Sequence, residues 1–269
     1  MIKDITIGQY FPGDTPIHNI DPRVKIILTF VYIVALFVVD NILGFLVVFS
    51  LILSVILLAK LSIKIVLKGL KPIVMLVAFT SVINIFFTTG DPLISGLDWG
   101  MFTPTKQGLY NAIFVVIRVV LLIVGTSVLT YTTSPILLTD GMESLMNPLK
   151  YIKVPVHDIS MMMTIALRFI PTLIEETDKI MSAQKSRGAD FETGGLIKKA
   201  KALIPILIPL FVSAFRRAED LAIAMECRCY NGGKGRTRLR KYELQARDYM
   251  SLFVMALFLA AIILLNMIG

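Results

Sequence analysis

The chain has 269 residues, of which 56% are hydrophobic and 17% are charged, with a formal net charge of +8. Such an apolar, sparsely charged composition excludes an ordinary soluble domain and predicts an all-α integral membrane protein. The positive charge could suggest a nucleic-acid partner, but the basic residues lie beside apolar segments. Membrane topology explains this placement better, so we expect no nucleic-acid partner.

Five apolar segments approach the roughly 20 residues that a membrane-spanning helix needs. They predict a membrane domain at 1–131, a cytoplasmic domain of long amphipathic helices at 132–248, and a C-terminal transmembrane helix at 249–269. The four spans expected in the membrane domain cover about 24–39, 42–59, 72–87 and 109–131. The short Asp40-Asn41 turn makes the first two spans an antiparallel hairpin.

The distribution of Lys and Arg among the loops predicts the orientation. Basic residues gather in the N-terminal arm, in the loop before the third span and in 132–248, whereas the other two loops hold few. Because basic loops stay on the cytoplasmic side, we expect a multi-pass protein with a cytoplasmic N-terminus and, with five spans, an external C-terminus.

Lys60, Lys64, Lys68 and Lys71 recur at three- and four-residue spacing among apolar residues. This spacing indicates an amphipathic helix at an anionic lipid surface, although a merely solvated lysine face fits equally well. Two further segments are expected near the membrane surface. They are the loop 88–106, with Trp99 and Phe102 at headgroup level, and the basic run 234–241, in contact with anionic lipid.

The apolar runs inside 132–248 are too short to span. The run 202–215 is interrupted by Pro205 and Pro209, and the run 159–174 contains Arg168 and a kink at Pro171. A charge at mid-membrane costs about 2.5–3.5 kcal/mol on insertion scales, which keeps the run 159–174 out of the bilayer. The length of the run 202–215 favours a buried or re-entrant helix over a span. Their three- and four-residue periodicity instead predicts helices at about 135–146, 157–185 and 196–230.

The two long predicted helices end in the same frame, Ala-x-x-small-Arg-small. One copy is 183–188, centred on Arg187, and the other is 224–229, centred on Arg228. An arginine fork fits a carboxylate, and small neighbours would let each helix tip enter a cleft. A cation that complements the helix dipole is the simpler explanation for either arginine alone, but the repetition favours docking.

Several other functions are disfavoured. Cys227 and Cys229 are too close for a disulfide, and His18 and His157 are remote from them, so no metal site is expected. The sequence has no GxxxxGK[ST] phosphate loop, so ATP must act through a partner. An intramembrane enzyme needs ionisable groups within the spans, where only Arg118 stands out, and a stand-alone channel or carrier needs broken spans in matching halves.

Together these features resemble the T component, the transmembrane coupling subunit, of energy-coupling factor transporters. The resemblance extends over essentially the whole chain. It rests on the two arginine motifs, Ser186-Arg187-Gly188 and Cys227-Arg228-Cys229, and on the stretches 21–25, 168–173 and 217–222. One departure is the pair of cysteines around Arg228, where the family more often has Ala or Ser before the arginine and Gly after it.

The resemblance implies a non-catalytic subunit of a prokaryotic cell-membrane importer, without a cofactor of its own. Two ABC-type ATPase subunits, expected as a heterodimer, would each receive one arginine tip, and a small substrate-binding S component would bring a vitamin or similar micronutrient. The long amphipathic helices of 132–248 would then be coupling helices. The docking residues would be Ser186, Arg187, Gly188, Cys227, Arg228 and Cys229, supported by Arg168, Pro171, Arg217 and Glu219. The alternatives are a dedicated cobalt or nickel transporter subunit and, from another class, an intramembrane enzyme.

Overall fold

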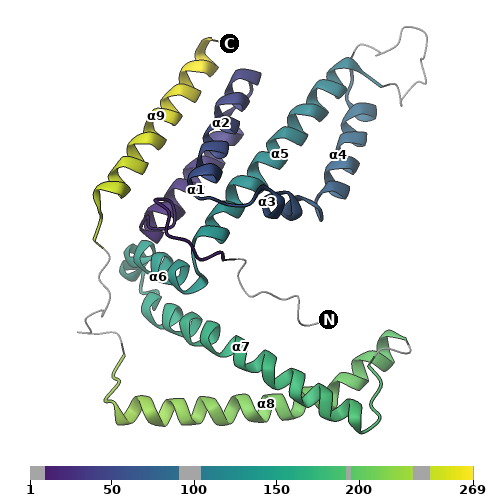
Figure 1. Ribbon diagram of the computed structural model, residues 1–269, viewed down its shortest axis with the longest axis vertical. Helices are drawn as coiled ribbons and strands as arrows, with labels where there is room; N and C mark the ends of the chain where they lie inside the picture. The colour runs from purple at the N-terminus through teal and green to yellow at the C-terminus, as the bar shows by residue number, and fades with distance from the viewer. Residues whose placement is uncertain (1–9, 91–103, 192–194, 233–242, 269) are drawn as a thin grey trace. The chain divides into compact units, whose positions relative to one another are not determined.

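The structure is a computed structural model that describes residues 10–90, 104–191, 195–232 and 243–268 (Figure 1). All regular elements in these ranges are helices, which confirms the all-α fold class. The contacts divide the chain into two compact units. We call them the α7–α8 unit (Met1–Ile7 and Met142–Lys241) and the α1–α5 unit (Gly8–Gly141 and Tyr242–Gly269).

The α1–α5 unit is a bundle of apolar helices. Its elements are α1 (Pro22–Val38), α2 (Ile42–Leu58), α3 (Ile63–Leu70), α4 (Val74–Phe87), α5 (Lys106–Thr132) and α9 (Ala246–Ile268). Asp21 caps α1 by accepting the N–H of Arg23 at 2.9 Å, and Pro22 occupies the first helical position, where its missing N–H costs nothing.

The core of this unit lies where α1, α2, α5 and α9 pack together. Tyr32 of α1 is buried against α5, and its hydroxyl donates to the Leu121 carbonyl at 2.8 Å. Gly125 makes room for this ring, because a Cβ there would lie 2.3 Å from a Tyr32 ring carbon. Many large apolar side chains remain exposed on the outer faces, as a lipid-facing bundle requires.

The lengths of the helices bear on the number of spans. Among the described helices, α5 and α9 are long and apolar enough to cross a membrane. α3 and α4 together meet the same test but are bent by 57°, so up to three spans qualify, and α2 is a shorter apolar helix. α1 and α2 have 17 residues each, slightly fewer than the roughly 20 expected. Five spans therefore stay a prediction.

The helices α4 and α5 form a close antiparallel hairpin. Thr105 caps α5 by accepting the Gly108 N–H at 3.1 Å, and its hydroxyl donates to the Thr88 carbonyl at 2.7 Å. A Cβ at Gly108 would lie 2.5 Å from the Asn84 carbonyl, so glycine permits this approach. Most of the loop between these helices, with Trp99 and Phe102, lies outside the described residues, as does the whole basic run 234–241.

A buried polar junction joins three helix ends in the α1–α5 unit. Lys25 of α1 is buried, and its ammonium donates to the carbonyls of His18 and Thr132 at 3.0 and 2.9 Å and to the Thr133 hydroxyl at 3.1 Å. The buried Asp248 carboxylate of α9 accepts the Asp21 N–H at 2.8 Å. This polar junction therefore links the start of α1, the end of α5 and the start of α9.

The α7–α8 unit contains the two longest helices that the structure describes. After the short 3-10 helix η3 (Asn147–Ile152) come α7 (Val156–Ser186) and α8 (Leu196–Cys227); α6 (Pro135–Leu145) lies across the boundary between the units. α7 continues through Pro171, and α8 continues through Pro205 and Pro209. Neither α7 nor α8 is among the described helices that are apolar enough over a spanning length to cross a membrane.

Candidate docking site at two arginine-capped helix tips

The C-terminal tip of α7 ends in a Schellman motif. Gly188 adopts a left-handed conformation, with φ of +86°. Its N–H donates to the Lys185 carbonyl at 3.0 Å, and the Ala189 N–H donates to the Gln184 carbonyl at 3.0 Å. These bonds satisfy the last carbonyls of the helix and stop it at Arg187, which is the C-cap residue.

The tip of α8 repeats this arrangement bond for bond. Cys229 occupies the left-handed position with φ of 54°. The Cys229 N–H donates to the Glu226 carbonyl at 2.9 Å and the Tyr230 N–H donates to the Met225 carbonyl at 3.0 Å. Arg228 is the C-cap residue, so the frame shared by the two sequences corresponds to one shared backbone geometry.

The two arginines have nearly the same backbone conformation. Arg187 has φ −90° and ψ 6°, and Arg228 has φ −92° and ψ 15°. Both side chains are exposed, and within the described residues neither guanidinium has a hydrogen-bond or ion-pair partner. Each tip thus presents five N–H donors in a planar fork, which suits a carboxylate on another molecule.

An ion pair connects the two helices. The guanidinium of Arg217 on α8 lies 2.5 Å from the Glu176 carboxylate on α7, with side chains 32% and 22% exposed. Arg187 follows Glu176 by eleven residues, and Arg228 follows Arg217 by the same eleven. At 1.5 Å per residue, each C-cap arginine lies about 16 Å along its helix from this shared ion pair.

The helical segments between the ion pair and the tips are suited to transmitting a displacement rigidly. Residues 176–187 and 217–228 contain neither proline nor glycine, because Pro171, Pro205 and Pro209 all precede them. Figure 1 shows α7 and α8 crossing, with their C-terminal ends on opposite sides of the crossing. We call residues 176–187 and 217–228 the two arms of the unit. The arms are straight, equal in length and end in the same kind of tip.

The predicted supporting residues have different surroundings. Arg217 makes the ion pair just described, whereas Arg168 and Glu219 are exposed on α7 and α8. Pro171 lies inside α7 without ending it. Their predicted roles remain hypotheses.

Sequence reasoning did not single out Glu176 as a site residue. The signal that could have found it is the equal spacing, because Glu176 precedes Arg187 by the same interval as Arg217 precedes Arg228.

The two left-handed positions predict opposite effects on stability. A side chain at positive φ costs about 1–2 kcal/mol, part of which glycine returns through its larger unfolded-state entropy. Replacing Cys229 by glycine should therefore raise the free energy of unfolding by about 0.5–1 kcal/mol, whereas Gly188→Ala should lower it by about 1 kcal/mol. Thermal unfolding of the purified full-length variants measures both shifts.

Gly195 supplies the control for this comparison. It is the N-cap of α8 with φ of −71°, and a Cβ there would meet nothing within 4 Å. Gly195→Ser adds a Cβ and keeps a favourable N-cap residue, so it should change stability much less than Gly188→Ala. Equal losses at both positions would show that the left-handed geometry of the α7 tip is not what makes glycine necessary.

Fold and site together define a class of protein: an all-helical membrane protein with two matched, exposed, arginine-capped helix tips. Comparison with known sequences agrees, because residues 13–239 match the CbiQ family, described as Cobalt transport protein. A relative from Clostridium kluyveri is 57% identical over 255 residues, covering 93% of both chains. Relatives from Ruminiclostridium cellulolyticum and Bacillus subtilis are 51% and 45% identical, each covering at least 98% of both chains.

All three relatives carry the name energy-coupling factor transporter transmembrane protein EcfT. The chain therefore belongs to the family of energy-coupling factor transporter transmembrane proteins. This result confirms the resemblance that the arginine motifs indicated.

Proposed function

We propose that this chain is the non-catalytic coupling subunit of an energy-coupling factor importer in a prokaryotic cell membrane. In this proposal two ABC-type ATPase subunits, expected as a heterodimer, dock on the tips at Arg187 and Arg228. A small membrane S component binds the substrate, a vitamin or similar micronutrient, and delivers it through the same assembly. Neither ATP hydrolysis nor substrate capture is assigned to this chain.

The observation that carries the proposal is the geometric match of the two tips. Two similar ATPase subunits related by an approximate two-fold axis would need two similar docking surfaces. Such an arrangement also favours two arms of equal length. The chain offers the same C-capped arginine twice, at equal distance from the Glu176–Arg217 ion pair. A single arginine at a helix end would be explained by the helix dipole alone.

Coupling then follows from the stiffness of the arms. When ATP closes the two ATPase subunits, the docked tips move with them, and a continuous helix carries this displacement toward the ion pair. Small side chains flank each arginine, namely Ser186 and Gly188 at one tip and Cys227 and Cys229 at the other, so a groove can close around the guanidinium. The movement would reorient the S component and release its cargo inward.

Co-purification tests this proposal at the level of composition. The full-length chain, extracted from its native membrane in mild detergent, should carry two ATPase chains and a small membrane protein in stoichiometric amounts. Recovery of the chain without any ATPase would contradict it. Identification of every small membrane protein that co-purifies would also show whether one S component or several are served.

A metal cargo is the alternative that the comparisons keep open, because the matching family is described as Cobalt transport protein. Among the described residues no group of three or more His, Cys, Asp or Glu could hold a metal ion. The cargo would then be chosen by the S component in either case. Uptake of radiolabelled cobalt or nickel, measured against vitamin uptake in cells that depend on this chain, distinguishes the two cargo classes.

A further inference from the structure

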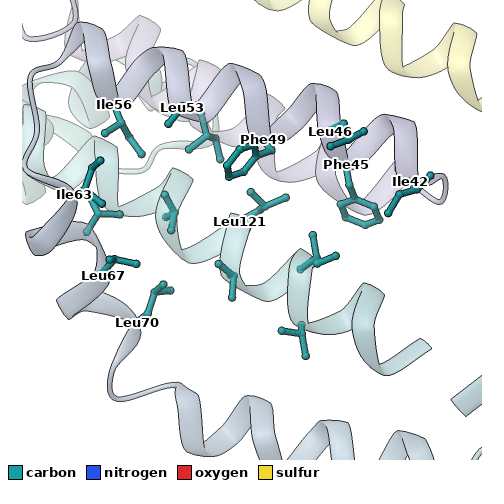
Figure 2. A pocket seen from close by; sticks show the side chains of 16 residues that line it. Ile42, Phe45, Leu46, Phe49, Leu53, Ile56, Ile63, Leu67, Leu70 and Leu121 are labelled. Atoms are coloured by element: carbon teal, nitrogen blue, oxygen red, sulfur yellow. The ribbon is translucent and has the colours of Figure 1, made fainter. Parts of the chain in front are cut away.

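A groove runs along the α1–α5 unit between α2, α3 and α5. It has a volume of about 500 Å³ and an almost wholly apolar lining. Figure 2 shows side chains of α2, including Phe49 and Leu53, and of α3, including Leu67, pointing into the same space beside Leu121 of α5. Phe49 is 53% exposed and Leu67 is 58% exposed, so the groove is open to its surroundings.

The helix α3 has three sides with different surroundings. One side packs on α5, since Val66 is buried and a Cβ at Gly69 would lie 3.1 Å from the Tyr131 hydroxyl. The next side lines the groove with Ile63, Leu67 and Leu70. At about 100° per residue, Lys64 and Lys68 fall on the side beyond the groove, away from α5.

The lysines therefore form a charged rim beside an apolar groove. Lys60, Lys64, Lys68 and Lys71 are all exposed, and within the described residues none has a hydrogen-bond or ion-pair partner. Long lysine side chains can extend toward the membrane surface while their stems cover apolar neighbours. The groove and its rim together form an apolar surface with cations along one edge.

Lys60 occupies a position where glycine is favoured. It follows α2 with φ of 52°, its N–H donates to the Leu57 carbonyl at 3.1 Å, and the Leu61 N–H donates to the Ile56 carbonyl at 3.2 Å. Glycine would adopt this left-handed geometry without strain. A lysine there is consistent with a requirement for its charge on the rim.

We propose that this groove is a binding site for an anionic phospholipid. One acyl chain lies between α2, α3 and α5, and the phosphate is held by the rim lysines Lys64 and Lys68, with Lys60 and Lys71 adding to the positive field. Charge complementarity selects an anionic headgroup over a zwitterionic one, because each basic residue near the surface favours an anionic lipid.

The division of this surface matches the two parts of a phospholipid. The groove is lined almost wholly by apolar side chains, and the exposed lysines lie along its α3 edge. An acyl chain fits the apolar lining, and an anionic headgroup fits the cations beside it.

Photochemical labelling tests the site directly. The full-length chain, extracted with its native partners, is reconstituted in phosphatidylcholine vesicles containing phosphatidylglycerol with a photoreactive acyl chain. Labelled peptides should come from the groove walls at 42–56 and 116–124, and unlabelled phosphatidylglycerol should compete far better than phosphatidylcholine. Lys64→Gln and Lys68→Gln should each reduce labelling about fivefold, as expected for one basic residue near an anionic surface.

Two further variants make the result decisive. Leu67→Trp should fill the groove and suppress labelling while leaving the lysines in place, and Lys106→Gln, at the exposed start of α5, should leave labelling unchanged. Equal labelling by photoreactive phosphatidylcholine would overturn the proposal in favour of ordinary lipid contact. Photocrosslinking of groove residues to a protein helix would overturn it in favour of a protein partner.

The groove belongs to the α1–α5 unit, whereas the arginine tips belong to the α7–α8 unit. Loss of lipid labelling in the lysine variants should therefore occur with ATPase binding intact. The lipid-site proposal and the docking proposal can therefore fail independently of each other.

Discussion

Replacing both Arg187 and Arg228 by glutamate should abolish binding of the ATPase subunits, while the protein still inserts into the membrane. Breaking a buried charge pair from one side costs about 3–5 kcal/mol, so each single variant should weaken its own docking contact at least about a hundredfold. ATPase subunits recovered with the purified chain, and ATP-dependent uptake in reconstituted vesicles, measure the two effects. The single variants should lose uptake even where some ATPase remains bound, because one arm then moves without the other.

Lys198 provides a matched control. It is exposed in the first turn of α8, so Lys198→Glu makes the same change of charge at the opposite end of that helix, where the dipole favours an acidic side chain. ATPase binding should persist in this variant. Unchanged uptake in both arginine variants would contradict the docking assignment, and equal loss in Lys198→Glu would show a general effect of charge.

The helix tips could be predicted from the sequence because their signals are local. A helix ends where a left-handed residue follows the last turn, and Gly188 and the glycines after Tyr230 mark such ends. The first predicted helix, 157–185, differs from α7 by one residue at each end. The second was expected to reach Tyr230 but stops at Cys227, because the left-handed residue is Cys229, which has no glycine-like signal.

The ion pair and the groove could not be predicted in the same way. Glu176 and Arg217 are 41 residues apart, and their contact depends on how α7 packs against α8. The lysine spacing did predict an amphipathic helix, but not that its apolar side would be left partly unpacked beside α2 and α5. Periodicity shows which residues share a face, whereas packing decides what that face meets.

The polar junction is among the least local features of the α1–α5 unit. Asp21 and Asp248 are 227 residues apart, yet the Asp248 carboxylate accepts the Asp21 N–H at 2.8 Å and the Gln245 N–H at 2.8 Å. Without this carboxylate, the two donors at the starts of α1 and α9 would lose their partner in a largely buried place. Since such a loss costs about 1–3 kcal/mol for each group, the junction should contribute strongly to holding α9.

Asp248→Ala should therefore lower the free energy of unfolding by about 3 kcal/mol. This loss corresponds to a fall of roughly 10 °C in the thermal midpoint. Asp248→Asn, which keeps one acceptor oxygen, should lose less, and Lys25→Met should lose as much as Asp248→Ala because two backbone carbonyls lose their shared donor. Glu219→Ala, at an exposed carboxylate of α8, should stay within about 0.5 kcal/mol of the parent. Protease cleavage near residue 245 should rise only in the junction variants, because α9 detaches first. Cleavage unchanged in Asp248→Ala would mean that apolar contacts with α1 and α2, rather than the carboxylate, hold α9 in place.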